Sequence, residues 1–359
     1  MIMTAASYWV LIVSFAQGPT GGLYLAQFDT KAQTLTQVQH ITEGINRPIF
    51  ARFSADGTQL FVADDVGDDP DSRNGALAIF DFDQKTGKLT LKGRTSTQGR
   101  SSCYVGLTDK LALVANYSQG NIIAIPYDKT GPLPGAMTFE HQGSSVNTRR
   151  QKGPHPHSFV PSPSGRFALS ADLGTDEVYI YPVHGAKVEH ASSVIKMKPG
   201  AGPRHIAFSP DGKMMFIVNE LDGTLCSFAW DDTKGQAERL DCNPTLPADF
   251  TGQNTAADIY THPFRPLVYT SNRGLDSIAV SACDKAGKLT LKANIPSGGG
   301  HPRGFTITPD GRFILVANRD SDNVVLFTVD PETGLPAATG KTLTIPKPMC
   351  ITTQPRPRK

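Results

Sequence analysis

Short apolar runs recur along this chain, and each is bounded by turn residues. The clearest example alternates apolar and polar positions over residues 203–209, which is typical of a half-buried strand. A Pro-Asp-Gly turn follows at 210–212, where glycine can adopt a positive φ without steric cost. Two further runs lie at 214–218 and 224–230, and a weaker fourth run precedes the next repeat. Four short antiparallel strands of this kind predict one blade of a β-propeller.

The same template repeats at nearly constant spacing. Four segments begin at a proline (Pro48, Pro156, Pro203 and Pro302), continue through a turn glycine, and end in a second apolar strand. Two less regular units start near 101 and 256, and a seventh starts near 348. The units are roughly 46 to 54 residues long, which is in the range of propeller repeats. The sequence therefore predicts an all-β, seven-bladed β-propeller with four antiparallel strands per blade.

The last unit has only its innermost strand, at 348–352, and the missing three strands are found at the N-terminus, at 8–15, 22–29 and 34–41. We therefore predict that the C-terminal strand closes the first blade, because ring closure removes two open sheet edges. No linker or low-complexity segment interrupts the pattern, so we expect a single domain over residues 1–359.

Composition narrows the functional classes. Charged residues make up 19% and hydrophobic residues 39% of the chain, as in soluble globular proteins. The net charge of +2 argues against nucleic-acid binding, and no apolar run is long enough to span a membrane. The apolar segment 8–16 is similar to the centre of a signal peptide, but no Lys or Arg precedes it and it fits the strand template. Five cysteines without CxxC spacing favour reduced thiols and a cytoplasmic location.

Two positions in each repeat carry the candidate chemistry. The start of the first strand and the end of the second lie at the same end of an antiparallel pair, so both positions should ring one mouth of the central channel. The residues after the proline position are Ile49, Ser101, His157, Arg204, Ala257, Arg303 and Met349. The residues at the strand end are Asp65, Tyr117, Leu173, Glu220, Arg273, Arg319 and Phe15. Four arginines around one mouth would repel one another unless an anion binds there.

Two nearby features are interpreted differently. His155 and His157 share a strand face, but no carboxylate or cysteine accompanies them in sequence, so we expect no metal and no cofactor. The basic cluster at 149–152 is interpreted as a loop rather than as a binding arm.

Several motifs resemble one known family. They are the Gly-Pro-Arg-His motif at 202–205 with Asn-Glu-Leu at 219–221, Gly-Pro-His-Pro-His at 153–157, Ser-Asn-Arg-Gly at 271–274 and His-Pro-Arg-Gly-Phe at 301–305. Together they resemble the propeller lactonase family, which includes bacterial 6-phosphogluconolactonases and fungal 3-carboxy-cis,cis-muconate lactonizing enzymes. The resemblance covers essentially the whole chain. It implies a catalytic group at His157, Arg204, Glu220 and Arg273, and the shared register selects the same four residues.

The implied chemistry is the opening of a lactone. Arg204 and Arg273 would stabilise negative charge on the carbonyl oxygen, and His157 or Glu220 would accept the proton of the attacking water. Arg303 and Arg319 would bind a phosphate or a second carboxylate. The expected substrate is a small anionic lactone, 6-phosphogluconolactone above all, in the pentose phosphate pathway. A muconate cycloisomerase and a non-catalytic propeller that binds an anion or a protein remain alternatives, because one fold hosts many functions.

Overall fold

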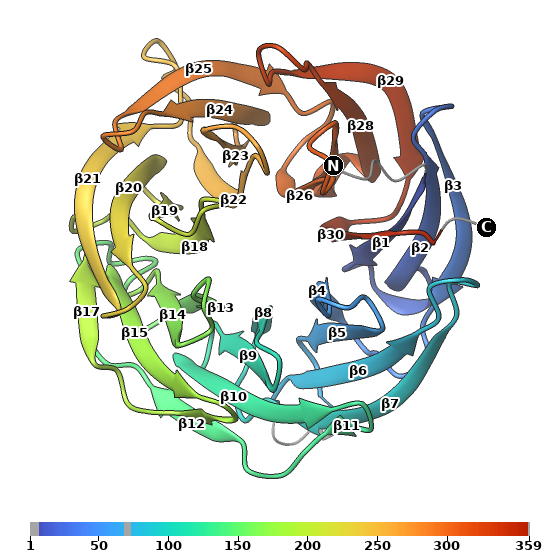
Figure 1. Cartoon of the computed structure of the whole chain (residues 1–359), viewed down its shortest axis with the longest axis horizontal. Helices are drawn as coiled ribbons and strands as arrows, with labels where there is room; N and C mark the ends of the chain where they lie inside the picture. The colour runs from blue at the N-terminus through green and yellow to red at the C-terminus, as the bar shows by residue number, and fades with distance from the viewer. Residues whose placement is uncertain (1–6, 68–72, 358–359) are drawn as a thin grey trace.

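Seven antiparallel sheets surround a central axis as the blades of a propeller (Figure 1). The computed structural model describes residues 7–67 and 73–357. Five sheets have four strands, and in the other two the outer edge is divided between two short strands. The prediction of an all-β, seven-bladed propeller is confirmed. The order along the chain is regular, because each blade is a meander that begins at the axis and ends at the rim.

The blades are described from the innermost strand outward. Blade 1 consists of β30 (Pro348–Pro355), β1 (Ser7–Ser14), β2 (Gly22–Asp29) and β3 (Thr34–Ile41), and blade 2 of β4 (Pro48–Phe53), β5 (Gln59–Asp64), β6 (Ala76–Phe82) and β7 (Leu89–Ser96). Blade 3 consists of β8 (Ser102–Leu107), β9 (Leu111–Asn116) and β10 (Asn121–Asp128), with β11 (Gly131–Pro132) and β12 (Met137–Glu140) at its edge. Blade 4 consists of β13 (Pro156–Pro161), β14 (Phe167–Asp172) and β15 (Glu177–His184), with β16 (Lys187–Val188) and β17 (Ser193–Lys196) at its edge.

The remaining three blades have four strands each. Blade 5 consists of β18 (Pro203–Phe208), β19 (Met214–Asn219), β20 (Thr224–Asp231) and β21 (Gln236–Pro244). Blade 6 consists of β22 (Thr255–Thr261), β23 (Leu267–Arg273), β24 (Ser277–Cys283) and β25 (Leu289–Pro296). Blade 7 consists of β26 (Pro302–Ile307), β27 (Phe313–Asn318), β28 (Asn323–Val329) and β29 (Pro336–Thr344). Two short 3-10 helices, η1 (Gly18–Thr20) and η2 (Arg319–Ser321), follow β1 and β27.

The C-terminal strand closes the ring as predicted. β30 pairs antiparallel with β1 from Tyr8 opposite Pro355 to Ser14 opposite Pro348. It also contacts the innermost strands of both neighbouring blades, β26 and β4. The first strand is almost entirely buried, so the apolar segment near the N-terminus is a core strand of the propeller. Its hydrophobicity is explained by this burial.

The core lies between neighbouring blades. Both faces of the second strand in each blade are covered, so these strands are continuous apolar runs rather than alternating ones. β9 and β27 are buried at every position, whereas the outer strand β7 is exposed or half-buried throughout. Large side chains bridge the blades, as where Phe28 packs edge-on against Phe313 at 4.9 Å. Each buried aromatic or aliphatic side chain contributes about 1.5–3 kcal/mol, and the summed packing holds the inner strands rigidly around the axis.

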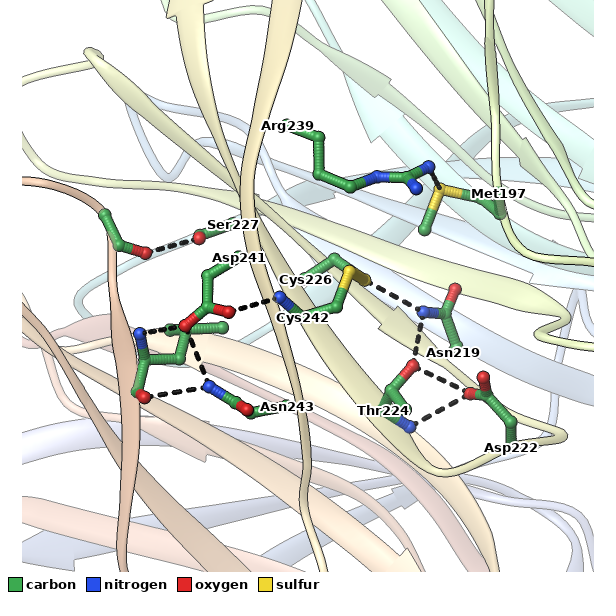
Figure 2. Close-up of a disulfide and its surroundings, with 12 residues drawn as sticks. Met197, Asn219, Asp222, Thr224, Cys226, Ser227, Arg239, Asp241, Cys242 and Asn243 are labelled. Atoms are coloured by element: carbon green, nitrogen blue, oxygen red, sulfur yellow. Dashed lines mark hydrogen bonds between the residues drawn. A yellow bond between two sulfur atoms is a disulfide. The ribbon is translucent and has the colours of Figure 1, made fainter.

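One expectation about the cysteines is wrong. Cys226 on β20 and Cys242 on β21 lie directly opposite each other and form a disulfide (Figure 2). Cys103, Cys283 and Cys350 are buried free thiols. Disulfides persist mainly in oxidising environments, so the cytoplasmic location inferred from five reduced thiols loses that support. Within the described residues, no helix is long and apolar enough to cross a membrane.

Candidate functional site

The strand-end positions form a ring at one mouth of the channel. Six of the seven residues donate a backbone N–H to the carbonyl oxygen of the residue that precedes the innermost strand, and Arg273 pairs with Thr255 at the equivalent place. Glu220, for example, donates to the Gly202 carbonyl at 2.7 Å. The backbone therefore fixes all seven positions in equivalent places, and only the side chains differ from blade to blade.

The positions after the proline are displaced by a β-bulge in every blade. The ladder between β13 and β14 shifts at His157, the ladder between β18 and β19 shifts at Arg204, and the ladder between β26 and β27 shifts at Arg303. A bulge leaves the extra residue out of the ladder and turns its side chain, so one irregularity supplies a functional position in each blade. In blade 3 the bulge falls at Cys103 and not at the predicted Ser101, because this unit lacks the proline that marks the start.

Glu220 lies at the centre of a charged cluster drawn from three blades and one loop. Its Oε1 accepts a hydrogen bond from Arg150 Nη2 at 2.7 Å. Its Oε2 lies 2.9 Å from Arg204 Nε, 3.0 Å from Arg273 Nη2 and 3.8 Å from His157 Nε2. These contacts to Oε2 are ion contacts rather than well-aligned hydrogen bonds, since the same oxygen has no hydrogen-bond partner. The structure thus brings together all four residues of the predicted catalytic group.

Backbone carbonyl groups hold the two inner arginines in place. Arg204 donates from Nη1 to the Ala257 carbonyl at 2.6 Å, and Arg273 donates from Nη2 to the Ala256 carbonyl at 2.6 Å. Both guanidinium groups are almost completely buried, with 2% and 7% of their side chains exposed. Their positions are therefore set before any ligand arrives, which is the arrangement that stabilises developing charge most effectively.

The protonation states of the central pair follow from burial and from the arginines. Burial alone would raise the pKa of Glu220, but Arg273, Arg204 and the other nearby positive groups outweigh it, and the pKa lies well below its usual range. Burial, reinforced by Arg204, lowers the pKa of His157 well below 6.5. At neutral pH the pair is therefore a carboxylate beside an uncharged imidazole.

The two further predicted arginines are placed differently. No residue within 7–67 and 73–357 accepts a hydrogen bond from the Arg303 side chain or forms an ion pair with it, and burial and the charges of Arg204 and Arg273 lower its pKa to about 9. Such a cation favours an added anion. Arg319 lies on η2 and forms a two-point ion pair with its neighbour Asp320, at 2.8 and 3.1 Å. It is not part of the cluster around Glu220.

Sequence reasoning missed Arg150. The sequence predicts the cluster 149–152 as a loop rather than a binding arm, yet the Arg150 side chain donates to Glu220 at 2.7 Å and to the Tyr117 hydroxyl at 3.0 Å. Tyr117 in turn stacks on His155 at 4.5 Å and meets the His157 ring edge-on at 5.3 Å. Because the loop lies outside the repeat, the register of the strands could not identify Arg150.

A second layer supports His157. The Cys103 thiol lies 3.8 Å from His157 Nδ1, and burial raises the pKa of this thiol to about 12. Cys103 is therefore a protonated packing group rather than a nucleophile. On the other side the His205 ring lies 5.4 Å from the His157 ring, and its Nδ1 contacts Asp258 Oδ1 at 2.8 Å. Burial lowers the pKa of His205 to about 4, so it adds no positive charge at neutral pH.

Space for a ligand adjoins the cluster. A cavity of about 680 Å³ opens beside Arg273 and is lined by Asn254, Asp276, His301 and Asp320 among others. A smaller chamber of about 280 Å³, lined in part by His205 and Asp258, lies further along the inner strands. Among the residues described by the structure, no group of three or more His, Cys, Asp or Glu side chains could hold a metal ion.

Comparison with known proteins points to one family. A family model described as "Lactonase, 7-bladed beta-propeller" matches residues 9–353. A 6-phosphogluconolactonase from Bacillus subtilis is 28% identical over 94% of this chain and 96% of its own, and one from Formosa agariphila is 32% identical over 88% and 90%. The structure of a periplasmic gluconolactonase from Pseudomonas aeruginosa superimposes with a TM-score of 0.89 at 27% identity, covering 98% of this chain and all of the other.

Proposed function

This chain belongs to the seven-bladed β-propeller lactonase family, and from that premise we propose that it hydrolyses a sugar lactone, 6-phosphogluconolactone above all. The observation that carries the proposal is the buried Glu220 carboxylate, which is surrounded by arginines beside a neutral His157. The names of relatives from two bacteria support the choice of substrate class. If the substrate is 6-phosphogluconolactone, the protein acts in the pentose phosphate pathway.

In the proposed reaction a water molecule attacks the lactone carbonyl carbon. The new carbon–oxygen bond forms while the imidazole of His157 accepts a proton from the water. The carbonyl oxygen becomes an oxyanion, which Arg204 and Arg273 stabilise, with Arg303 as a further nearby positive charge. The ring carbon–oxygen bond then breaks, the leaving oxygen takes the proton from the imidazolium, and the product is an open-chain hydroxy acid.

Glu220 has a positioning and electrostatic role in this scheme. Both of its carboxylate oxygens are engaged by arginines, which favours the uncharged His157 as the base. The carboxylate lies 3.8 Å from His157 Nε2, where it would stabilise the imidazolium once the proton has transferred. It also holds Arg204 and Arg273, so that both face the reacting carbonyl. No metal or cofactor takes part in the scheme.

The test is a lactonase assay of the purified protein. We expect hydrolysis of 6-phosphogluconolactone well above the spontaneous rate, with the unphosphorylated lactone as a second substrate. A parallel assay with 3-carboxy-cis,cis-muconate examines the cycloisomerase alternative, in which no water is consumed. Conversion of the muconate without lactone hydrolysis would replace the proposed function, and no turnover of any substrate would favour an anion-binding propeller.

A further inference from the structure

Arg150 differs from the other two arginines around Glu220 in how it is held. Arg204 and Arg273 are fixed by backbone carbonyl oxygens, whereas Arg150 contacts only side chains, Tyr117 and Glu220, both through Nη2. No described residue accepts a hydrogen bond from its Nε or Nη1. Its side chain is 38% exposed, while that of Glu220 is 3% exposed. Arg150 therefore presents open donors at the outer side of the cluster.

The backbone that carries Arg150 is well anchored. Gln151 is completely buried, and its side chain accepts from the Asn147 N–H at 3.0 Å and donates to the Leu173 carbonyl at 2.9 Å. The Asn147 side chain accepts from the N–H groups of Arg149 and Arg150, both at 3.1 Å. The loop thus fixes the backbone of Arg150, while the Nε and Nη1 groups of its guanidinium remain available to a ligand.

We infer that Arg150 is a specificity-determining residue that binds an anionic group of the substrate remote from the lactone carbonyl, such as a phosphate ester. The inference rests on the proposed function. An arginine with free donors in a planar fork matches a phosphate or carboxylate by two parallel hydrogen bonds. Arg204 and Arg273 still neutralise Glu220 Oε2 when Arg150 turns its remaining donors outward. Arg303, whose charge interacts with those of Arg204 and Arg273, is left for the reacting end.

The experiment compares two substrates that differ in one phosphate, 6-phosphogluconolactone and glucono-δ-lactone. Arg150→Gln should lower kcat/KM for the phosphorylated lactone by about 10- to 100-fold more than for the neutral lactone, and the excess loss should lie mainly in KM. Arg150→Lys should recover part of the loss, because the charge remains while the fork is lost. Arg149→Gln is the matched control, since Arg149 is the exposed neighbour without a side-chain contact to the cluster.

Product binding tests the same inference without turnover. Measured by calorimetry, the affinity for 6-phosphogluconate should fall by about tenfold or more in Arg150→Gln, and the affinity for gluconate should stay nearly unchanged. An equal loss on both lactones and both products would mean that Arg150 only positions Glu220, which overturns the inference while the proposed function stands. A wild-type protein that does not prefer the phosphorylated lactone would overturn it as well. If the wild type hydrolyses neither lactone, the proposed function itself fails.

Discussion

Among the buried histidine–carboxylate pairs of this propeller, His141–Asp172 and His157–Glu220 differ most clearly in how their polar groups are satisfied. His141 directly follows β12 at the edge of blade 3. Its Nδ1 contacts Asp172 Oδ2 of blade 4 at 2.7 Å, and its Nε2 contacts the Tyr181 hydroxyl at 2.8 Å. The other Asp172 oxygen accepts backbone N–H groups, two of them at 2.8 Å. Every polar atom of this pair has a partner, and those partners belong to the blade itself or to the strands beside it.

The pair at the mouth is built in the opposite way. His157 Nε2 and Glu220 Oε2 are 3.8 Å apart, which is too far for a direct hydrogen bond. Glu220 Oε2 has charges around it but no well-aligned hydrogen bond, and Arg303 nearby has a pKa lowered to about 9. A buried polar network in which every donor and acceptor has a partner stabilises the fold. One that has excess positive charge and unpaired hydrogen-bonding groups can bind a ligand. The difference lies in completeness, because both pairs are buried.

The largest predicted effect separates the two histidines. His157→Ala should reduce turnover by about 10²–10⁴, because the proton acceptor is lost, and the fold should remain. His141→Ala should cost about 1–3 kcal/mol of unfolding free energy, because it leaves Asp172 and Tyr181 unpaired, with little change in kcat. Steady-state kinetics and denaturant unfolding on both variants check this. A large loss of kcat in His141→Ala with normal stability would contradict the assignment of His141 as structural and His157 as catalytic.

The arginines should follow the same division. Arg204→Ala or Arg273→Ala should lower kcat by about 10²–10³, because a donor to the developing oxyanion is removed. Arg319→Ala should affect KM more than kcat, since Arg319 pairs with Asp320 outside the cluster. Arg312, paired with Asp310 in the same blade, is a control for the loss of a surface guanidinium. If Arg319→Ala lowers kcat as much as Arg204→Ala does, Arg319 also belongs to the catalytic cluster.

The pH dependence should show an acid limb well below neutrality. The lowered pKa of His157 keeps the imidazole unprotonated down to below about pH 6.5, the value for an exposed histidine. In the unfolded chain His157 takes up a proton below that pH, so the folded state loses stability as the pH falls from there. The lowered pKa of Glu220 acts in the same direction, since its contribution is present above the unfolded value and is lost as the pH falls through the folded one.

The measurement is kcat and unfolding free energy between neutral pH and the acid limit of stability. We expect a flat kcat through about pH 6.5 and a gradual fall in stability below it. A kcat that halves near that pH in a protein of constant stability would mean that His157 titrates as an exposed histidine, and its burial would then have no catalytic consequence.

Chelation should have no effect. The positions that ring the mouth offer two carboxylates, Asp65 and Glu220, which come from different blades and are each paired with arginine, and this is a poor site for a divalent cation. We predict that EDTA leaves kcat unchanged within error. Loss of activity that a divalent ion restores would show a metal site that this arrangement does not suggest.

Among the substitutions, the smallest effect on activity is expected at the disulfide. It joins cysteines 16 residues apart in sequence, so Cys242→Ser should lower the free energy of unfolding by about 3 kcal/mol through the loss of a cross-link. Asn219, the residue before Glu220, contacts Cys226 Sγ at 3.5 Å (Figure 2), but kcat should change by less than about twofold. Thiol titration of protein taken directly from cells would show whether the disulfide forms there. Five reactive thiols after unfolding would support the cytoplasmic prediction.

Regular features could be predicted from the sequence because one rule governs every blade. The seven blades, the closure by β30 and the strand-end ring all follow from strand spacing and antiparallel geometry. His157, Arg204, Glu220 and Arg273 could be selected together because each occupies one of two repeated positions.

The features that were missed depend on geometry outside the repeat. Arg150 reaches Glu220 from a loop whose course depends on Gln151 and Asn147, not on strand register. The shift from Ser101 to Cys103 reflects a unit without its marker proline. The disulfide depends on the register of an outer strand that contains a bulge between Ser227 and Phe228, and sequence spacing does not reveal which residues then lie opposite. Arg319 lies on a 3-10 turn that directs it to its own neighbour.

The most direct test is a paired measurement on Glu220→Gln and Asp172→Asn. Each variant removes one buried negative charge and keeps the shape of the side chain. We predict that Glu220→Gln loses about 10²–10⁴ in kcat for 6-phosphogluconolactone while it remains folded at the assay temperature. Asp172→Asn should lose stability and keep kcat within about threefold. A folded Glu220→Gln variant with near-normal kcat would contradict the central claim that the incomplete, arginine-surrounded pair is the catalytic one.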